Sequence, residues 1–213
     1  MDNITYLCDM PPILTLILVS LLFSTAIIIG VSRNRRFRRK ERLHQELAAE
    51  LGLKVAYMNE RDFDLFGEYR GYPLQIEPLA LPEKAKAKNQ NFYIRISLPM
   101  VNPNLKSLRI VKSGSESGPL DSYRIIDRPL RINPEIAPWL ELSTNDAMFS
   151  GLIVSDDIKI SLFEVFQPLD SGLIFLQDEE LTALLPFLIS SKQSLHQVKV
   201  MTDLLADMKD QLN

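Results

Sequence analysis

This chain has a long apolar stretch near its N-terminus that carries no charge. After it, hydrophobic and polar positions alternate first with the period of a helix and then with the period of a strand. Residues 10–32 carry no charged side chain, and residues 13–29 consist mainly of Leu, Ile, Val and Phe. About 20 such residues in a helix, each rising about 1.5 Å, cross a hydrocarbon core of about 30 Å. Pro11 and Pro12 suit the first turn of a helix, where amide protons have no partner within the helix. The pattern predicts a transmembrane helix over residues 11–32.

A cleaved signal peptide or a buried core helix would contain a similar apolar run. A signal peptide begins with positive charge, whereas residues 1–10 carry Asp2 and Asp9 and no Lys or Arg. A buried helix is not normally followed by a dense group of cations. Seven cations follow here and are called the basic cluster below: Arg33, Arg35, Arg36, Arg38, Arg39, Lys40 and Arg42. A retained anchor is therefore the expectation.

The basic cluster also predicts an orientation. Lys and Arg flanking a membrane span stay on the cytoplasmic side, and all of this charge lies after the span. We expect a short outer N-terminus at residues 1–10 and a cytoplasmic C-terminal domain, in the cell (inner) membrane. Two interpretations of the cluster stay open. Either it determines topology alone, or it also binds anionic lipid headgroups, with each cation near the surface contributing about 1 kcal/mol of binding free energy.

Beyond the cluster the helical period returns and then gives way to alternation. Leu43, Leu47 and Leu51 recur every four residues and Gly52 follows, which predicts a basic juxtamembrane stalk helix over residues 33–52. Short segments of period two come next, at residues 53–58, 65–69 and 72–76. Arg70 and Gly71 separate the last two, which predicts a hairpin with Tyr69 opposite Tyr72.

The rest of the chain predicts further strands and three helices. Residues 92–98 alternate most clearly, with Phe92, Ile94, Ile96 and Leu98 on one face, and a strand near 105–112 follows. Three prolines within 121–143 favour edge strands or extended connections over central strands. Residues 82–91 and 113–119 read as loops. Helices are expected over 146–153, 158–166 (with a strand as the alternative) and the C-terminal segment, and a second hairpin with an acidic turn at 178–180. The class is α+β, with a transmembrane helix followed by a cytoplasmic domain over residues 53–213, built of antiparallel hairpins packed with helices.

Charge and composition narrow the function. The chain has net charge −3, but the part after the basic cluster is acidic, which argues against a nucleic-acid partner. The lone cysteine, Cys8, excludes a disulfide within the chain. His44 and His196 are the two histidines, and both are expected to be solvated helix residues without a carboxylate at ligand spacing.

No motif assigns an activity. The triplet Lys112, Ser113, Gly114 occurs in penicillin-binding acyltransferases, but the accompanying Ser-x-x-Lys is missing. No phosphate-binding glycine motif occurs. Paired carboxylates at residues 62/64, 156/157 and 179/180 are expected at turns and helix caps. The sequence therefore predicts no catalytic, cofactor or metal site.

The run from Leu47 to Ile76 contains Ala-Glu-Leu-Gly-Leu and then Gly67, Tyr69 and Gly71 in a Gly-x-Tyr-x-Gly hairpin. In these features it resembles an uncharacterised bacterial membrane-anchored domain family of unknown function. The resemblance extends loosely through residues 147–187. It implies the fold and carries no activity.

The sequence therefore favours a single-pass, membrane-anchored, non-catalytic accessory or scaffolding subunit of a membrane protein complex. Its expected partners are the lipid bilayer and a membrane protein. An enzyme of unrecognised type and an anionic-lipid-binding membrane sensor are the alternatives.

Overall fold

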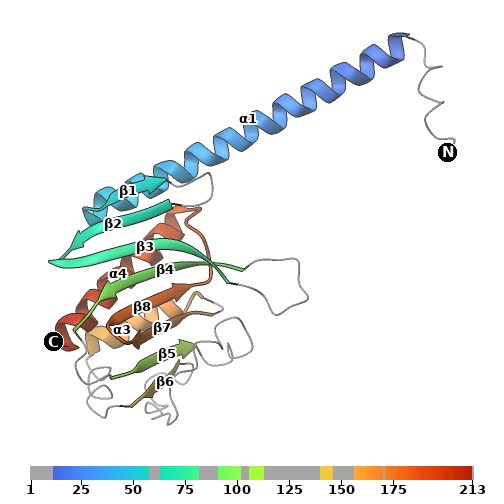
Figure 1. Ribbon diagram of the computed structural model, residues 1–213. Coiled ribbons are helices and arrows are strands. Elements are labelled where there is room, and N and C mark those ends of the chain that lie inside the picture. The colour runs from blue at the N-terminus through green and yellow to red at the C-terminus, as the bar shows by residue number, and fades with distance from the viewer. Residues whose placement is uncertain are drawn as a thin grey trace. The chain divides into compact units, whose positions relative to one another are not determined.

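The computed structural model describes residues 12–57, 63–81, 91–101, 106–112, 140–145, 156–169 and 171–212 (Figure 1). The chain divides into two compact units, Met1–Glu41 and Arg42–Asn213. Helix α1 (Pro12–Leu51) supplies all the described residues of the first unit and the first ten of the second. The second unit combines an antiparallel sheet with helices, which confirms the predicted α+β class.

The sheet has eight strands within the described part of the chain. Their order is β1-β2-β3-β4-β8-β7-β5-β6, and every neighbouring pair is antiparallel. The strands are β1 (Lys54–Tyr57), β2 (Phe63–Tyr69), β3 (Tyr72–Leu81), β4 (Asn91–Pro99), β5 (Leu108–Lys112), β6 (Leu140–Thr144), β7 (Leu173–Gln177) and β8 (Glu180–Leu185). The first four follow one another along the sheet, and the β7–β8 hairpin lies between β4 and β5.

Both predicted hairpins are confirmed. Tyr69 pairs with Tyr72 across a two-residue turn in which Arg70 and Gly71 have φ angles of 51° and 81°. Positive φ at both positions gives the turn whose twist matches that of the flanking strands. In the second hairpin Gln177 pairs with Glu180, and Asp178 has a φ of 55°.

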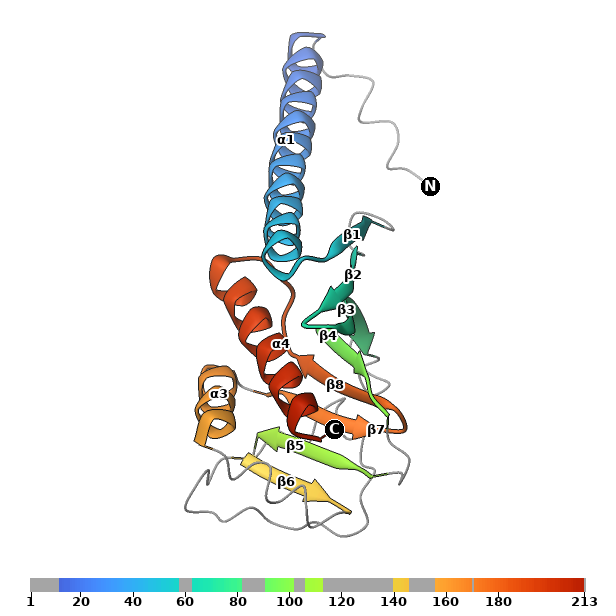
Figure 2. The ribbon, with the colours of Figure 1, turned by 90° about the vertical axis from the view of Figure 1, so that its left-hand side faces the viewer.

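Helices α3 (Asp156–Phe166) and α4 (Lys192–Leu212) lie on one face of the sheet (Figure 2). The alternation in β4 explains the packing, because Ile94, Ile96 and Leu98 point to this face and are fully buried. The apolar positions of α4 meet them there: Leu195, Val198, Met201, Leu204, Leu205 and Met208. Across the sheet, Tyr93 belongs to a smaller cluster with Val111, Leu173, Phe175 and Leu184.

The last turns of α1 belong to this core. Leu43, Leu47 and Leu51 are buried with the core residues of the sheet and α4, and Gly52 ends the helix with a φ of 70°. Glu50 and Lys199 form an ion pair at 3.1 Å, and Glu46 pairs with Lys192. The predicted helix continuing to Leu51 is thus confirmed, and its apolar stripe has an identified partner.

Some expectations fall outside the described residues. These are the helix at 146–153, the loop at 113–119 and residues 82–90 of the other predicted loop; Asn91 is the first residue of β4. The strand expected near 105–112 begins at Leu108. In the proline-containing region, β6 starts at Leu140 and lies at the edge of the sheet, as predicted.

Candidate functional site: the anchor helix and a hollow beside α4

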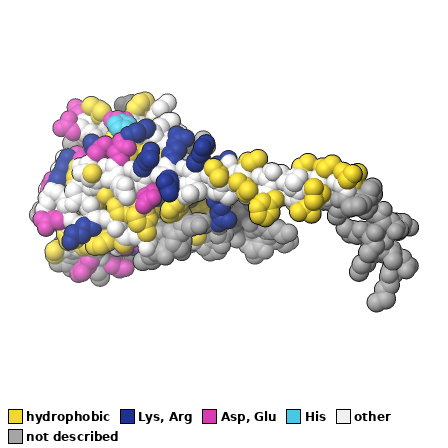
Figure 3. All heavy atoms as spheres, turned by 90° about the horizontal axis from the view of Figure 1, so that it is seen from above, with side chains coloured by type: hydrophobic (Ala, Val, Ile, Leu, Met, Phe, Trp, Pro, Cys, Tyr) yellow, Lys and Arg dark blue, Asp and Glu magenta, His cyan; other side chains and the backbone are white. Residues whose placement is uncertain are grey.

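The first part of α1 exposes large apolar side chains on all sides. Thirteen of them between Ile13 and Val31 are exposed, with Leu16 at 75% and Phe23 at 70%. An amphipathic helix would have one apolar stripe, whereas a helix that is apolar all round suits a lipid environment. By length and composition, α1 can cross a membrane, with a mean hydropathy of 2.1 in its most apolar window. Yellow side chains cover this stretch in Figure 3.

Three hydroxyl groups in this stretch bond to their own helix. Ser20 donates to the carbonyl of Ile17 at 2.8 Å, and Ser24 donates to the carbonyl of Ser20 at 2.8 Å. Thr25 donates to the carbonyls of Leu21 and Leu22. An unsatisfied polar group costs several kcal/mol in hydrocarbon, so these bonds make the hydroxyl groups compatible with a bilayer.

The basic cluster lies within α1, directly after its apolar stretch. All seven of its cations are exposed, and Figure 3 shows blue side chains gathered next to the apolar stretch. Successive residues on a helix are turned by about 100°, so the seven cations cover most of its circumference. Asn34, Phe37 and Glu41 fall together in the remaining sector, so one side of the helix carries no cation of the cluster.

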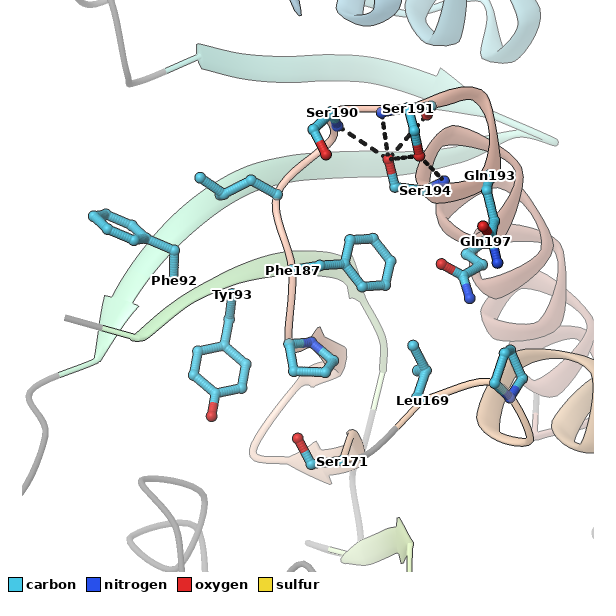
Figure 4. A pocket seen from close by; sticks show the side chains of 13 residues that line it. Phe92, Tyr93, Leu169, Ser171, Phe187, Ser190, Ser191, Gln193, Ser194 and Gln197 are labelled. Atoms are coloured by element: carbon cyan, nitrogen blue, oxygen red, sulfur yellow. Dashed lines mark hydrogen bonds between the residues drawn. The ribbon is translucent and has the colours of Figure 1, made fainter. Parts of the chain in front are cut away.

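A hollow of about 630 Å³ opens in the second unit where β8 leads into α4 (Figure 4). We call it the α4 hollow. Three separate chain segments line it: the start of β4, the connection from α3 to β7, and the segment from Pro186 through the first turns of α4. Its apolar wall consists of Phe92, Pro168, Leu169, Pro186, Phe187 and Leu188. Cavities of roughly 300–1,000 Å³ commonly hold ligands in proteins.

Five polar side chains of the α4 hollow have no hydrogen-bond partner within the described part of the chain. They are Tyr93, Ser171, Ser190, Gln193 and Gln197. Tyr93 is only 5% exposed, and burial raises the pKa of its hydroxyl above the ordinary value of 10. The hydroxyl is therefore a neutral donor at physiological pH. In Figure 4 the amides of Gln193 and Gln197 lie on the side of α4 that faces Phe187.

Two further serines of the hollow have a structural role. Ser191 Oγ accepts from the Ser194 amide at 3.1 Å, and Ser194 Oγ accepts from the Ser191 amide at 3.0 Å. This reciprocal pair is a capping box with serine in the position usually held by Glu or Gln. Because the cap already engages these two hydroxyls, Ser191 and Ser194 are structural residues of the helix start.

Toward the C-terminal end of α4, three aspartates spaced about one helical turn apart bond to side chains at the β2–β3 turn. Tyr69 donates to Asp203 at 2.5 Å, and Arg70 contacts Asp203 at 2.9 Å and Asp207 at 2.5 Å. Tyr72 donates to Asp210. Burial and the Asp203 carboxylate together raise the pKa of Tyr69. The bonded hydroxyl thus stabilises the fold at neutral pH, and this stabilisation is lost only as pH rises through the raised pKa.

We expect Asp203→Asn to lower the free energy of unfolding by about 1 kcal/mol, because two hydrogen bonds to a partly exposed carboxylate are weakened. Chemical denaturation followed by circular dichroism would measure the loss. The matched control is Asp156→Asn, since Asp156 is 90% exposed and its ion pair is with Lys159, one turn away on the same helix. Equal effects of the two substitutions would show that the contact of the turn with α4 adds no stability.

The histidine expectation is correct for one residue and wrong for the other. His196 is exposed, although its Nε2 lies 3.3 Å from Glu164 Oε1, a neighbour that was not anticipated. His44 is 6% exposed and stacks on Phe63 at 3.6 Å between ring centroids. The reason is its place on α1: His44 shares the buried side with Leu47 and Leu51. His44 is a core residue.

The other candidate groups have structural places. Lys112 donates to the carbonyls of Phe166 at 3.3 Å and of Leu169, so it stabilises the C-terminal end of α3. Asp156 and Asp157 occupy the first turn of α3, and Glu180 pairs with Arg95 at 2.6 Å. Among the residues described, no group of three or more His, Cys, Asp or Glu side chains is placed to hold a metal ion. Cys8, Asp62, Ser113 and Gly114 lie outside those residues.

Sequence reasoning missed the α4 hollow and the contact of the β2–β3 turn with α4. The spacing of Asp203, Asp207 and Asp210 along one helix face was a usable signal for the second. For the α4 hollow, the available signal in the sequence was Pro186, which directly follows β8.

Comparison with known proteins adds one structural similarity. No protein-family model and no curated protein matches the chain. Among solved structures, the chain is similar to the crystal structure of the mycobacterial trehalose monomycolate transport factor A, TtfA, with a TM-score of 0.49 and 12% sequence identity. The match covers 81% of this chain and 95% of that one.

Proposed function

We propose that this protein is a single-pass membrane-anchored, non-catalytic accessory or scaffolding subunit of a membrane protein complex. In this proposal residues 1–10 lie outside the cell (inner) membrane and the C-terminal domain is cytoplasmic. One observation carries it. Helix α1 exposes apolar side chains all round between residues 13 and 31 and buries Leu43, Leu47 and Leu51 in the domain core. The same helix thus contains both the apolar stretch and, in its last turns, residues of the domain core.

The structural positions of the candidate catalytic side chains also support a non-catalytic role. His44 is stacked in the core, Lys112 caps a helix, and Glu180 is paired with Arg95. A catalytic group needs a position facing a cleft and free to reach a substrate. The α4 hollow has no charged side chain among its described lining residues, which suits binding better than acid–base chemistry.

Purification of the full chain from membranes in mild detergent tests the proposal. The expected result is a stoichiometric complex with at least one other membrane protein, seen as a single species by size exclusion with mass spectrometry. Recovery of this chain alone, at the mass of the chain plus detergent, would contradict the subunit role. In that case the exposed cations of the basic cluster would favour the alternative of an anionic-lipid sensor.

The orientation has its own test. Replacing Arg35, Arg36, Arg38 and Arg39 with Gln removes four of seven cations and should give a mixed or inverted topology, because charge asymmetry around the span sets its direction. A reporter fused after residue 213 that is active only outside the cytoplasm would measure it, and should be silent on the unaltered chain. Replacing Lys54, Lys106, Lys159 and Lys192 with Gln removes the same charge far from the span and should leave the reporter silent. Unchanged topology in the arginine variant would mean that other features set the direction.

A further inference from the structure

The α4 hollow lies where β4 extends beyond the end of its neighbour β8. On one side, β4 is paired with β3 down to Asn91, with Phe92 opposite Ala80 and Tyr93 opposite Leu79. On its other side, the ladder with β8 ends where Ile94 meets Leu185. Asn91, Phe92 and Tyr93 therefore extend past the last residue of β8.

The chain after β8 does not continue this ladder. Pro186 has no amide proton to donate, and the amide of Phe187 bonds back to the carbonyl of Leu185 at 2.9 Å. Within the described part of the chain, no backbone hydrogen bond joins Phe92 or Tyr93 to the segment after Leu185. In an antiparallel strand, alternate residues direct their N–H and C=O groups to the same side. At least one of these three residues of β4 thus directs its backbone groups to the side that β8 leaves open, where they have no backbone partner within the described part of the chain.

The opposite wall carries side chains that match a peptide backbone. Gln193 and Gln197 are one turn apart on α4, which separates them by about 6 Å along the helix. Alternate residues of an extended chain are separated by about 6.6 Å. A carboxamide offers one acceptor and two donors, so each glutamine has the groups needed to pair with one peptide unit.

The remaining lining excludes some ligands. Its described side chains are uncharged, so a phosphate, a carboxylate or a cation would find no counter-charge there. The rings of Phe92 and Phe187 with Leu169 and Leu188 suit apolar side chains.

We propose that the α4 hollow binds an extended, uncharged peptide segment of a protein partner, which adds to the edge of β4 where β8 ends. The segment runs beside Phe92 and Tyr93, and its outer peptide groups pair with Gln193 and Gln197. Strand addition of this kind takes its affinity from backbone hydrogen bonds and its specificity from the pockets for side chains. The inference rests on the proposed function, because it names how a partner subunit is held.

Site-specific photo-crosslinking on the full chain in its native membrane tests this. A benzoylphenylalanine at position 190, at the rim of the hollow, should cross-link to a partner protein within a stretch of at least four uncharged residues, mapped by mass spectrometry of the joined peptides. The control position is 211, which is exposed near the other end of α4 and outside the hollow. Cross-links from position 190 only to lipid, only to charged segments, or to nothing would overturn the proposal.

A second measurement keeps the result independent of the crosslinker. Gln193→Ala with Gln197→Ala should lower the cross-linked yield by about tenfold, the effect of losing two hydrogen bonds. As a control, Gln211→Ala should leave the cross-linked yield unchanged. An unchanged yield in the double variant would show that Gln193 and Gln197 are solvated and do not bind the peptide. A complex that purifies intact but gives no cross-link from position 190 would end this inference alone. Absence of any complex would instead contradict the proposed function.

Discussion

Replacing Leu47 with Ala is expected to lower the free energy of unfolding of the domain by about 2–5 kcal/mol, because the side chain is fully buried and its removal leaves a cavity. A domain of this size is typically stable by about 5–15 kcal/mol, so the loss would be a large fraction of the total. Chemical denaturation of the full chain in detergent micelles, followed by circular dichroism of the sheet, would measure it.

The control for this variant lies in the same helix. Leu21 is 61% exposed in the apolar stretch of α1, and Leu21→Ala removes the same atoms from a position outside the domain core. It should leave the unfolding of the domain unchanged. If Leu47→Ala behaved like Leu21→Ala, the last turns of α1 would not be part of the core, and the support for the anchored-subunit proposal would be lost.

The second large effect is expected at the β2–β3 turn. Gly71 has a φ of 81°, and a Cβ added there would meet no atom within 4 Å. Gly71→Val should therefore cost about 1–3 kcal/mol through the backbone alone, because a β-branched residue resists positive φ. Thermal or chemical unfolding measures this cost free of any steric clash.

Gly71→Asn is the matched variant, since asparagine adopts positive φ more readily than valine. It should recover most of the lost stability. If valine and asparagine were equally tolerated, the turn would have to adopt another conformation, and Tyr69 and Tyr72 would no longer be held opposite each other.

The elements predicted correctly are those that local sequence determines. The two hairpins follow from two-residue turns between alternating segments, and α4 follows from apolar spacings of three and four. The placement of His44 was wrong because burial of a helix face depends on what packs against it, and Phe63 comes from a distant strand. The neighbouring Leu43 and Leu47 were the available sign that this side of the helix is buried.

The α4 hollow could not be derived from local patterns. It depends on the register of β4 with β8, which determines how far Asn91 to Tyr93 extend beyond Leu185. Its lining comes from three segments that meet only in the folded chain. The contact of Tyr69 with Asp203 likewise joins residues 134 positions apart.

Three hydroxyl groups in the apolar stretch of α1 bear on how this helix would pack against another helix. Ser20, Ser24 and Thr25 each donate their proton to a carbonyl of their own helix, so these three hydroxyl protons are not free for a neighbouring helix. Ser20 and Ser24 nevertheless remain small, as do Ala26 and Gly30, and such residues at a spacing of four allow two helix backbones to approach closely. Selectivity for a transmembrane neighbour would then depend on shape, and a change of Ser24 to a larger apolar residue would alter it more than a change to alanine.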